Sequence, residues 1–168
     1  MDNARTPLME LTQNELTRYL LSHLNRIYCA KSELVDKLPQ LEKQAHFLDL
    51  QQAINETVED VREQLKRMQR IFILLDSYYT YESCIGLQGM LDEAFQSIGP
   101  QSGEASLRDF SILFYMENIE SIEKASFKMM MLVADKLHNS EVVQLLRECY
   151  DEAIEDLILF RQIADAYV

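Results

Sequence analysis

Two stretches of the chain repeat one helical hydrophobic pattern at a fixed distance, and each pattern contains a charge at its centre. Side chains in both stretches follow steps of four and three residues, which places them on one face of a helix. Lys31 interrupts the first stripe and Glu123 interrupts the second, 92 positions later (123 − 31). The first stripe is Leu20, Leu24, Ile27, Lys31, Leu34, Leu38 and Leu41, and the second is Ile112, Met116, Ile119, Glu123, Ser126, Met130 and Val133. Each stripe therefore puts a charge where the core should be.

Two further polar positions obey the same offset. Asp60 corresponds to Glu152 (152 − 60), and Gln64 corresponds to Asp156 (156 − 64). The sequence thus indicates two helical hairpins of one plan that direct polar groups into a shared core. Four-helix bundles build metal and cofactor sites from side chains placed in this way.

Composition and charge restrict the class of protein. A length of 168 residues suits one domain with a sizeable core. The hydrophobic content of 48%, with only 4 Gly and 3 Pro, argues against disorder and against a β-rich fold. A net charge of −12 argues against nucleic acid or an anionic membrane as partner, because both need a basic surface. No apolar run reaches the ~18 residues of a membrane-spanning helix. The first residues lack an apolar signal core, so we expect a cytoplasmic location.

The helices can be placed from capping and turn signals. Residues 1–11 are expected to be a flexible arm, and residues 12–168 a single domain. Thr12 and Glu15 match a capping box that opens a helix over 12–45, and Pro39 predicts a kink or short break within it. Further helices are expected over 49–76, 80–98, 106–137 and 140–166. Asp49 with Gln52 should cap the first of these, and Ser106 with Asp109 should cap the third. Gly86 and Gly89 suggest that the helix over 80–98 packs closely against a neighbour. The segment Ile98–Gly103 is the clearest loop.

Connection lengths predict how the helices are arranged. Short turns join the first two long helices and the last two, so each pair should be antiparallel. The segment of about 30 residues between the pairs is long enough to start the third long helix at the same end as the second. We therefore expect an all-α, ferritin-like antiparallel four-helix bundle with a long crossover that contains an additional shorter helix.

The three cysteines are widely spaced and odd in number. Cys29, Cys84 and Cys149 form no Cys-x-x-Cys motif, so the spacing supports neither a disulfide framework nor a zinc site. We expect free, buried thiols.

Several segments together carry a resemblance to a known family. They are 27–34 (IYCAKSEL), 50–72, 84–94 (CIGLQGMLDEA), Arg108-Asp109, 119–123 (IESIE) and 145–152 (LLRECYDE). In order and nearly without gaps, over about residues 20–165, they resemble the ferritin-like stress proteins of the YciE/YciF type. The resemblance implies an antiparallel bundle, usually dimeric, with carboxylates at its centre and a stress-response setting.

This chain departs from the family pattern at the central carboxylates. The resemblance implies a glutamate at Lys31, a histidine at Ser121 between Glu120 and Glu123, and an aspartate at Leu157. The second helix has Glu59-Asp60-Val61 followed by Gln64 in place of Glu-Glu-Thr, and Asp156 can compensate for the aspartate replaced at Leu157. We therefore expect a degenerate metal site, whose vestigial or conditional ligands would be Asp60, Glu120, Glu123 and Glu152.

Lys31 leaves three interpretations open. Its ammonium could neutralise core carboxylates, its long stem could carry the charge to solvent, or a metal could be retained beside it. The candidate core charge network is Lys31, Tyr28, Asp60, Gln64, Glu123, Glu152 and Asp156, in which Tyr28 either bonds a carboxylate or only packs. Glu120 points inward or lies at a partly exposed helix edge. None of His23, His46 and His138 follows a candidate glutamate by three residues, so we do not expect histidine ligands.

Two classes of function remain from the sequence. The first is a non-catalytic, stress-associated protein with no cofactor that acts through protein interaction, as a homodimer. The second is a di-iron or di-manganese carboxylate protein with oxidase or peroxide-consuming activity, which needs several inward ligands and an open coordination position. For the dimer, apolar residues beyond the four stripes suggest a contact near the crossover helix: Tyr78, Tyr79, Tyr81, Phe95, Met129 and Met131.

Overall fold

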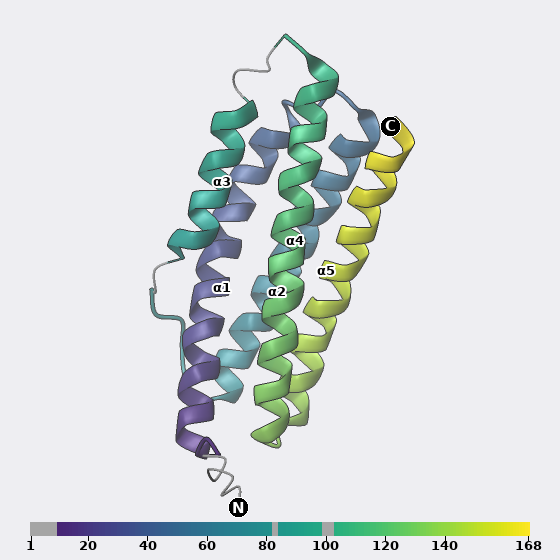
Figure 1. Ribbon diagram of the computed structural model, residues 1–168. Coiled ribbons are helices and arrows are strands. Elements are labelled where there is room, and N and C mark those ends of the chain that lie inside the picture. The colour runs from purple at the N-terminus through teal and green to yellow at the C-terminus, as the bar shows by residue number, and fades with distance from the viewer. Residues whose placement is uncertain (1–9, 82–83, 99–102) are drawn as a thin grey trace, which may run out of the picture.

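A computed structural model describes residues 10–81, 84–98 and 103–168, and these residues form five helices. The helices are α1 (Gln13–Glu42), α2 (Leu48–Leu74), α3 (Ile85–Ile98), α4 (Ala105–Lys136) and α5 (Ser140–Tyr167). The four long helices run alongside one another, and the shorter α3 packs outside α1 and α4 (Figure 1). The predicted all-α bundle is confirmed. No helix in the described ranges is long and apolar enough to cross a membrane.

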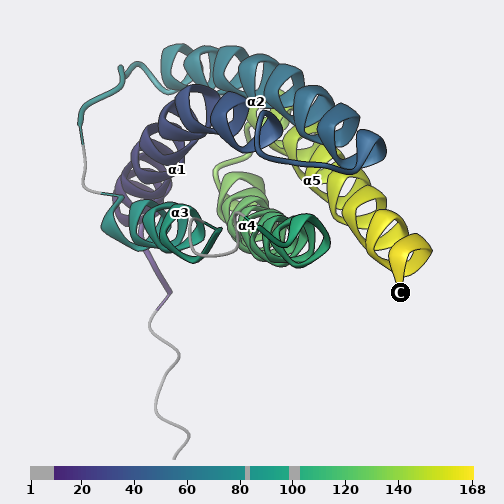
Figure 2. The ribbon, with the colours of Figure 1, turned by 90° about the horizontal axis from the view of Figure 1, so that it is seen from above.

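The chain path is that of a bundle with one long crossover. Viewed along its axis, the bundle has the cyclic order α1, α2, α5, α4 (Figure 2). The side chain of Gln13, at the start of α1, donates to the Lys136 carbonyl at the end of α4 (3.1 Å). At the opposite end, Phe47 before α2 stacks on Tyr167 of α5 with ring centroids 3.6 Å apart. α2 and α4 therefore start at the same end, as the connection lengths predict.

Local capping explains where the helices begin at one end of the bundle. The Thr12 hydroxyl accepts from the Glu15 N–H, and the Glu15 carboxylate accepts from the Thr12 N–H, so the predicted capping box is confirmed. At the same end, the Asn139 side chain accepts from the Val142 N–H and caps α5. Each bond satisfies a backbone donor that has no partner within its helix.

At the other end, the predicted caps are wrong. The N-cap of α2 is Phe47, which makes no side-chain cap bond, and Asp49 lies in the first turn. Ser106 does not cap α4 either, because the helix already begins at Ala105. Asp109 is buried and accepts from the backbone N–H groups of His46 and Phe47. A carboxylate on α4 thus accepts the hydrogen bonds of two backbone N–H groups in the turn before α2.

The crossover differs from the expectation in its start and its packing. α3 begins at Ile85 and not near residue 80, since the preceding segment lies along α1, where the Thr80 N–H donates to Asn25 (2.7 Å). Gly86 and Gly89 are exposed, and a Cβ on either would meet no atom within 4 Å, so the predicted close packing is wrong.

Pro39 does not break α1. The helix continues for three more residues to Glu42, although a proline beyond the first turn removes one backbone hydrogen bond. Most of the expected arm and of the expected 98–103 loop lies outside the described residues.

Candidate functional site: a buried polar layer

A layer of polar side chains divides the bundle core into two apolar parts. One apolar cluster includes Leu38, Ile54 and Phe160, and the other includes Leu20 and Phe127. Between them, the four long helices contribute buried polar residues at corresponding heights: Lys31 from α1, Thr57 and Gln64 from α2, Glu120 and Glu123 from α4, and Asp156 from α5. The polar stripe positions therefore meet at the middle of the bundle.

Lys31 and Glu123 form an ion pair at the centre of this layer. The Lys31 Nζ contacts Glu123 Oε2, and both side chains are at most 1% exposed. The ammonium also lies 5.4 Å from the centroid of the Phe127 ring, close enough for a cation–π interaction. Of the orientations left open by the sequence, the structure has the internal one, and the stem does not carry the charge to solvent.

Two other carboxyl groups crowd the same layer. Burial and then the neighbouring Glu123 and Asp156 raise the pKa of Glu120 well above its usual range, with Lys31 opposing the shift. Burial, followed by Asp60 and Glu123, raises the pKa of Asp156 to about 7, while Lys31 and the Thr57 hydroxyl offset part of it. Glu120 therefore holds its proton more tightly than an exposed glutamate does. The ammonium of Lys31 and the raised pKa values of these two carboxyl groups both limit the negative charge of the layer.

Asp60 and Glu152 lie at the edge of the layer and not at its centre. Both are half-buried. Glu152 pairs with Arg67, whose Nη2 lies 2.7 Å from Glu152 Oε1, and the same guanidinium reaches Glu148 at 3.1 Å. Burial and the charge of Glu152 raise the pKa of Asp60, and Arg67 opposes them. Glu152 is thus neutralised from the surface, independently of Lys31.

Arg67 and Thr57 are site residues that the sequence reasoning missed. Arg67 follows the buried Gln64 by three residues, so it lies near the same helix face, and this spacing was the available signal. The Gln64 side chain is buried and its Oε1 has no hydrogen-bond partner within the described residues.

Tyr28 packs and does not bond a central carboxylate. Its hydroxyl accepts from the Gln69 side chain at 2.7 Å. Its ring lies against Tyr79, with centroids 4.5 Å apart, and meets Phe72 edge-on. Tyr28 therefore belongs to the contact between the bundle and the crossover segment.

The donor set does not match a di-metal centre of the ferritin-like kind. Such a centre takes carboxylates from two helices and a Glu-x-x-His pair from each of the others. Here a lysine ammonium contacts Glu123, and His46 and His138 lie in turns. Ser121, where the resemblance implies a histidine, is exposed on α4. Within the ranges that the structure describes, no three or more His, Cys, Asp or Glu side chains are grouped so that they could hold a metal ion.

The bundle and its polar layer define an all-α protein of the ferritin-like kind, and comparisons with known proteins identify the family. The family described as "Domain of unknown function (DUF892)" matches residues 15–168, so the chain belongs to it. No match was found among curated proteins.

Solved structures share the fold. The E. coli stress protein YciF is 20% identical, with a TM-score of 0.85 over 90% of this chain and 96% of that one. YcfI, a putative structural protein from Rhodopseudomonas palustris, is 22% identical, with a TM-score of 0.83 over 94% of this chain and 98% of that one. A protein from Xanthomonas campestris is 19% identical, with a TM-score of 0.67 over 90% of this chain and 92% of that one. The resemblance to the YciE/YciF type is confirmed, and at these identities the structures establish the fold.

Proposed function

We propose that this chain is a non-catalytic, stress-associated protein in which an internal ammonium–carboxylate network replaces metal ions. It carries no cofactor and acts through protein contacts, as a homodimer. The observation that supports this proposal is the buried pair of Lys31 and Glu123 at the centre of the bundle. The stress setting rests on the likeness to YciF and its family.

The charges in the layer favour a closed network over a metal centre. An ammonium presents three donors and no lone pair, so it satisfies carboxylates and repels a divalent ion placed beside it. Burial and then like charge raise the pKa of Glu120, and a carboxyl group that holds its proton more tightly binds a metal ion less readily. At the edge of the layer, the Arg67 guanidinium forms an ion pair with Glu152 and likewise neutralises its charge.

An uncharged face of α4 is the proposed surface for the second copy. Steps of three and four residues place it on one side of the helix, and its members are exposed or half-buried: Leu107, Ser111, Phe114, Asn118, Ser121, Ala125, Met129 and Leu132. This face carries no charge along most of a helix of 32 residues, in a chain with a net charge of −12. An uncharged stripe of this length suits a two-fold contact between helices.

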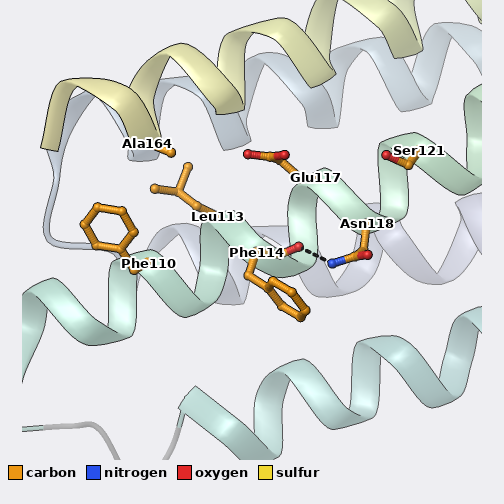
Figure 3. A pocket seen from close by; sticks show the side chains of 7 residues that line it. All are labelled: Phe110, Leu113, Phe114, Glu117, Asn118, Ser121 and Ala164. Carbon is orange, nitrogen blue, oxygen red and sulfur yellow. Dashed lines mark hydrogen bonds between the residues drawn. The ribbon is translucent and has the colours of Figure 1, made fainter. Parts of the chain in front are cut away.

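A shallow pocket lies along part of this face. Figure 3 shows Phe114, Asn118 and Ser121 following one another along α4. Ala164 of α5 lies across from Leu113 of α4 (Figure 3). The pocket has a volume of about 390 Å³, and the Asn118 amide is held by a bond to the Phe114 carbonyl (2.6 Å). Small and apolar side chains make up most of the lining, and its one charged residue, Glu117, is paired with Arg161 of α5 at 3.2 Å.

Sedimentation at micromolar concentration tests the dimer. The parent should have twice the mass of one 19.6 kDa chain, and Phe114→Lys should shift it to the monomer. Tyr78→Lys is the matched control, because Tyr78 is also a largely exposed aromatic residue but lies on the crossover. A monomeric parent refutes the dimer. Dissociation by the Tyr78 variant alone would move the contact to the crossover, where the sequence first suggested it.

Metal loading tests the closed network. The purified parent, incubated with iron or manganese and then desalted, should retain far less than one ion per chain, and its thermal midpoint should not depend on added metal. Near-stoichiometric metal in the core would overturn the proposal.

A specific observation keeps the second class of function open to test. One oxygen each of Gln64, Glu120 and Glu123 is buried and has no hydrogen-bond partner among the residues that the structure describes, so these oxygens form a partial set of ligands. Lys31→Glu returns the residue that the family resemblance implies. In chelator this variant should be less stable than the parent, because it adds a like charge. A rise of its midpoint with iron or manganese would show that the remaining residues are still competent ligands.

A further inference from the structure

Two cysteines that are far apart in the sequence meet in the structure. Cys29 on α1 and Cys84, just before α3, are 55 positions apart, and their Sγ atoms lie 2.6 Å from each other. Both are free thiols and at most 6% exposed. The expectation of buried free thiols is confirmed, but their spacing gave no sign of a pair. A disulfide bond is about 2.05 Å long, so only a small shift separates the two sulfurs from bonding distance.

Non-covalent contacts hold the crossover segment where the sulfurs meet. One helical turn before Cys29, the buried Asn25 side chain accepts from the Thr80 N–H at 2.7 Å. Beside Cys29, the Tyr28 ring packs on Tyr79. The reduced protein thus keeps both thiols together without a covalent link.

Solvent reaches this pair from one side. A surface pocket of about 300 Å³ is lined by Cys84, Gly86, Arg26 and His23, among others, and Cys29 does not line it. A Cβ on Gly86 would meet no described atom within 4 Å, so the pocket is open at this part of its lining. The guanidinium of Arg26 in the lining favours a small molecule that carries carboxylates.

We propose that Cys29 and Cys84 are a redox-active pair, which a small anionic disulfide of the glutathione class oxidises to an intramolecular disulfide, with the first exchange at Cys84. The Cys84 thiol loses its proton and attacks one sulfur of the small disulfide, whose S–S bond breaks and releases one small thiol. The Cys29 thiol then loses its proton and attacks Sγ of Cys84, which releases the second small thiol. Two protein thiols are oxidised, and one small disulfide is reduced to two thiols.

The bond would fasten the crossover to the middle of α1. It closes a loop of 55 positions, and cross-links of this length stabilise chiefly by restricting the unfolded chain. The thermal midpoint of the oxidised protein should therefore rise by roughly 10 °C for a domain of this size. Burial raises the pKa of Cys84 to about 12, so the exchange should be slow at neutral pH and quicken as pH rises.

Equilibration with mixtures of reduced and oxidised glutathione tests the pair in the whole chain. After an acid quench, peptide mass spectrometry without reduction should find Cys29 joined to Cys84, in a fraction that follows the redox mixture and returns to zero with excess dithiol. Cys149, which is fully buried in the apolar core, should stay free. Absence of the linked peptide in the most oxidising mixture would overturn the proposal. Equal modification of Cys149 would also do so, since it would mean that unfolding exposes every thiol.

Two serine variants test the order of attack. Cys29→Ser should accumulate a glutathione adduct on Cys84, because the resolving thiol is missing. Cys84→Ser should leave Cys29 unmodified over the same time, because Cys29 does not line the pocket. An adduct on Cys29 in the second variant, with none on Cys84 in the first, would refute the assigned order.

Discussion

The two halves of the bundle, α1 with α2 and α4 with α5, share a plan but differ in the charge they bring to the core. The three pairs of polar positions that the sequence relates by the offset of 92 have the same burial in both halves. Lys31 and Glu123 are buried, as are Gln64 and Asp156, while Asp60 and Glu152 are half-buried. The first half contributes an ammonium and an amide to the centre, and the second half contributes the carboxyl groups. Equivalent backbone positions thus hold complementary side chains.

This difference determines how the core can be neutral. Three carboxyl groups of the second half, on Glu120, Glu123 and Asp156, face one ammonium of the first. Because burial and like charge oppose ionisation, the pKa values of Glu120 and Asp156 are raised, so these carboxyl groups hold their protons more tightly than exposed ones do. The polar layer is therefore sensitive both to the loss of its one cation and to pH.

Removing the cation should have the largest effect. Lys31→Met leaves Glu123 buried without its partner, and breaking a buried pair in this way costs about 3–5 kcal/mol of the free energy of unfolding. Urea unfolding at pH 7 measures it. Lys37→Met is the matched control, because Lys37 pairs with Asp92 at the surface of α1, where such pairs contribute at most about 1 kcal/mol. Equal losses in the two variants would mean that the central pair contributes no more than a surface pair.

Removing one surplus carboxyl should abolish part of the pH dependence. Asp156 faces Asp60, Glu123, Lys31, Glu120 and the Thr57 hydroxyl, and its pKa is about 7 in the folded protein against 3.8 ordinarily. The folded state therefore binds the proton more tightly, and stability falls as pH rises from about 4 to 7.

Asp156→Asn imitates the protonated group and removes this fall. At pH 8 the variant should exceed the parent by about 2–4 kcal/mol, and near pH 4 the two should agree. Urea unfolding across this range measures both. Asp151→Asn, an exposed change on the same helix, is the control. A variant that loses stability at pH 8 would show that the ionised carboxylate is needed.

Asp109 joins the two halves and has no polar counterpart in the core of the first. Asp109→Ala leaves the N–H groups of His46 and Phe47 without their acceptor, and the second of these two bonds is buried. Bonds to a charged group contribute about 1.5–3 kcal/mol, so we expect a loss of about 2–3 kcal/mol. Urea unfolding measures the loss, and hydrogen exchange should show faster exchange at these amides. Unchanged exchange there would contradict the assigned contact.

The part of this structure that could be predicted from the sequence is the part that depends on neighbours in the chain. Helix periodicity placed Lys31 and Glu123 on inward faces, and the spacing of Thr12 and Glu15 predicted a local cap. Asp109 was misread as a cap of its own helix, because its acceptor role depends on a turn 62 or more positions away. The pairing of Cys29 with Cys84, and of Arg67 with Glu152, likewise depends on packing between helices, which periodicity does not specify.

The smallest expected effect compares equivalent helix starts. Thr12 caps α1, and Glu104, at the same offset of 92 (104 − 12), is the N-cap of α4 but makes no side-chain cap bond. Thr12→Ala should therefore cost about 1 kcal/mol, since it removes the acceptor for the Glu15 N–H. Glu104→Ala should cost only a few tenths of that, because it removes no cap bond. Urea unfolding of both variants at pH 7 compares them. Equal losses would mean that the capping box of Thr12 and Glu15 does not stabilise the start of α1. The starts of α1 and α4 would then be equally stable despite their different sequences.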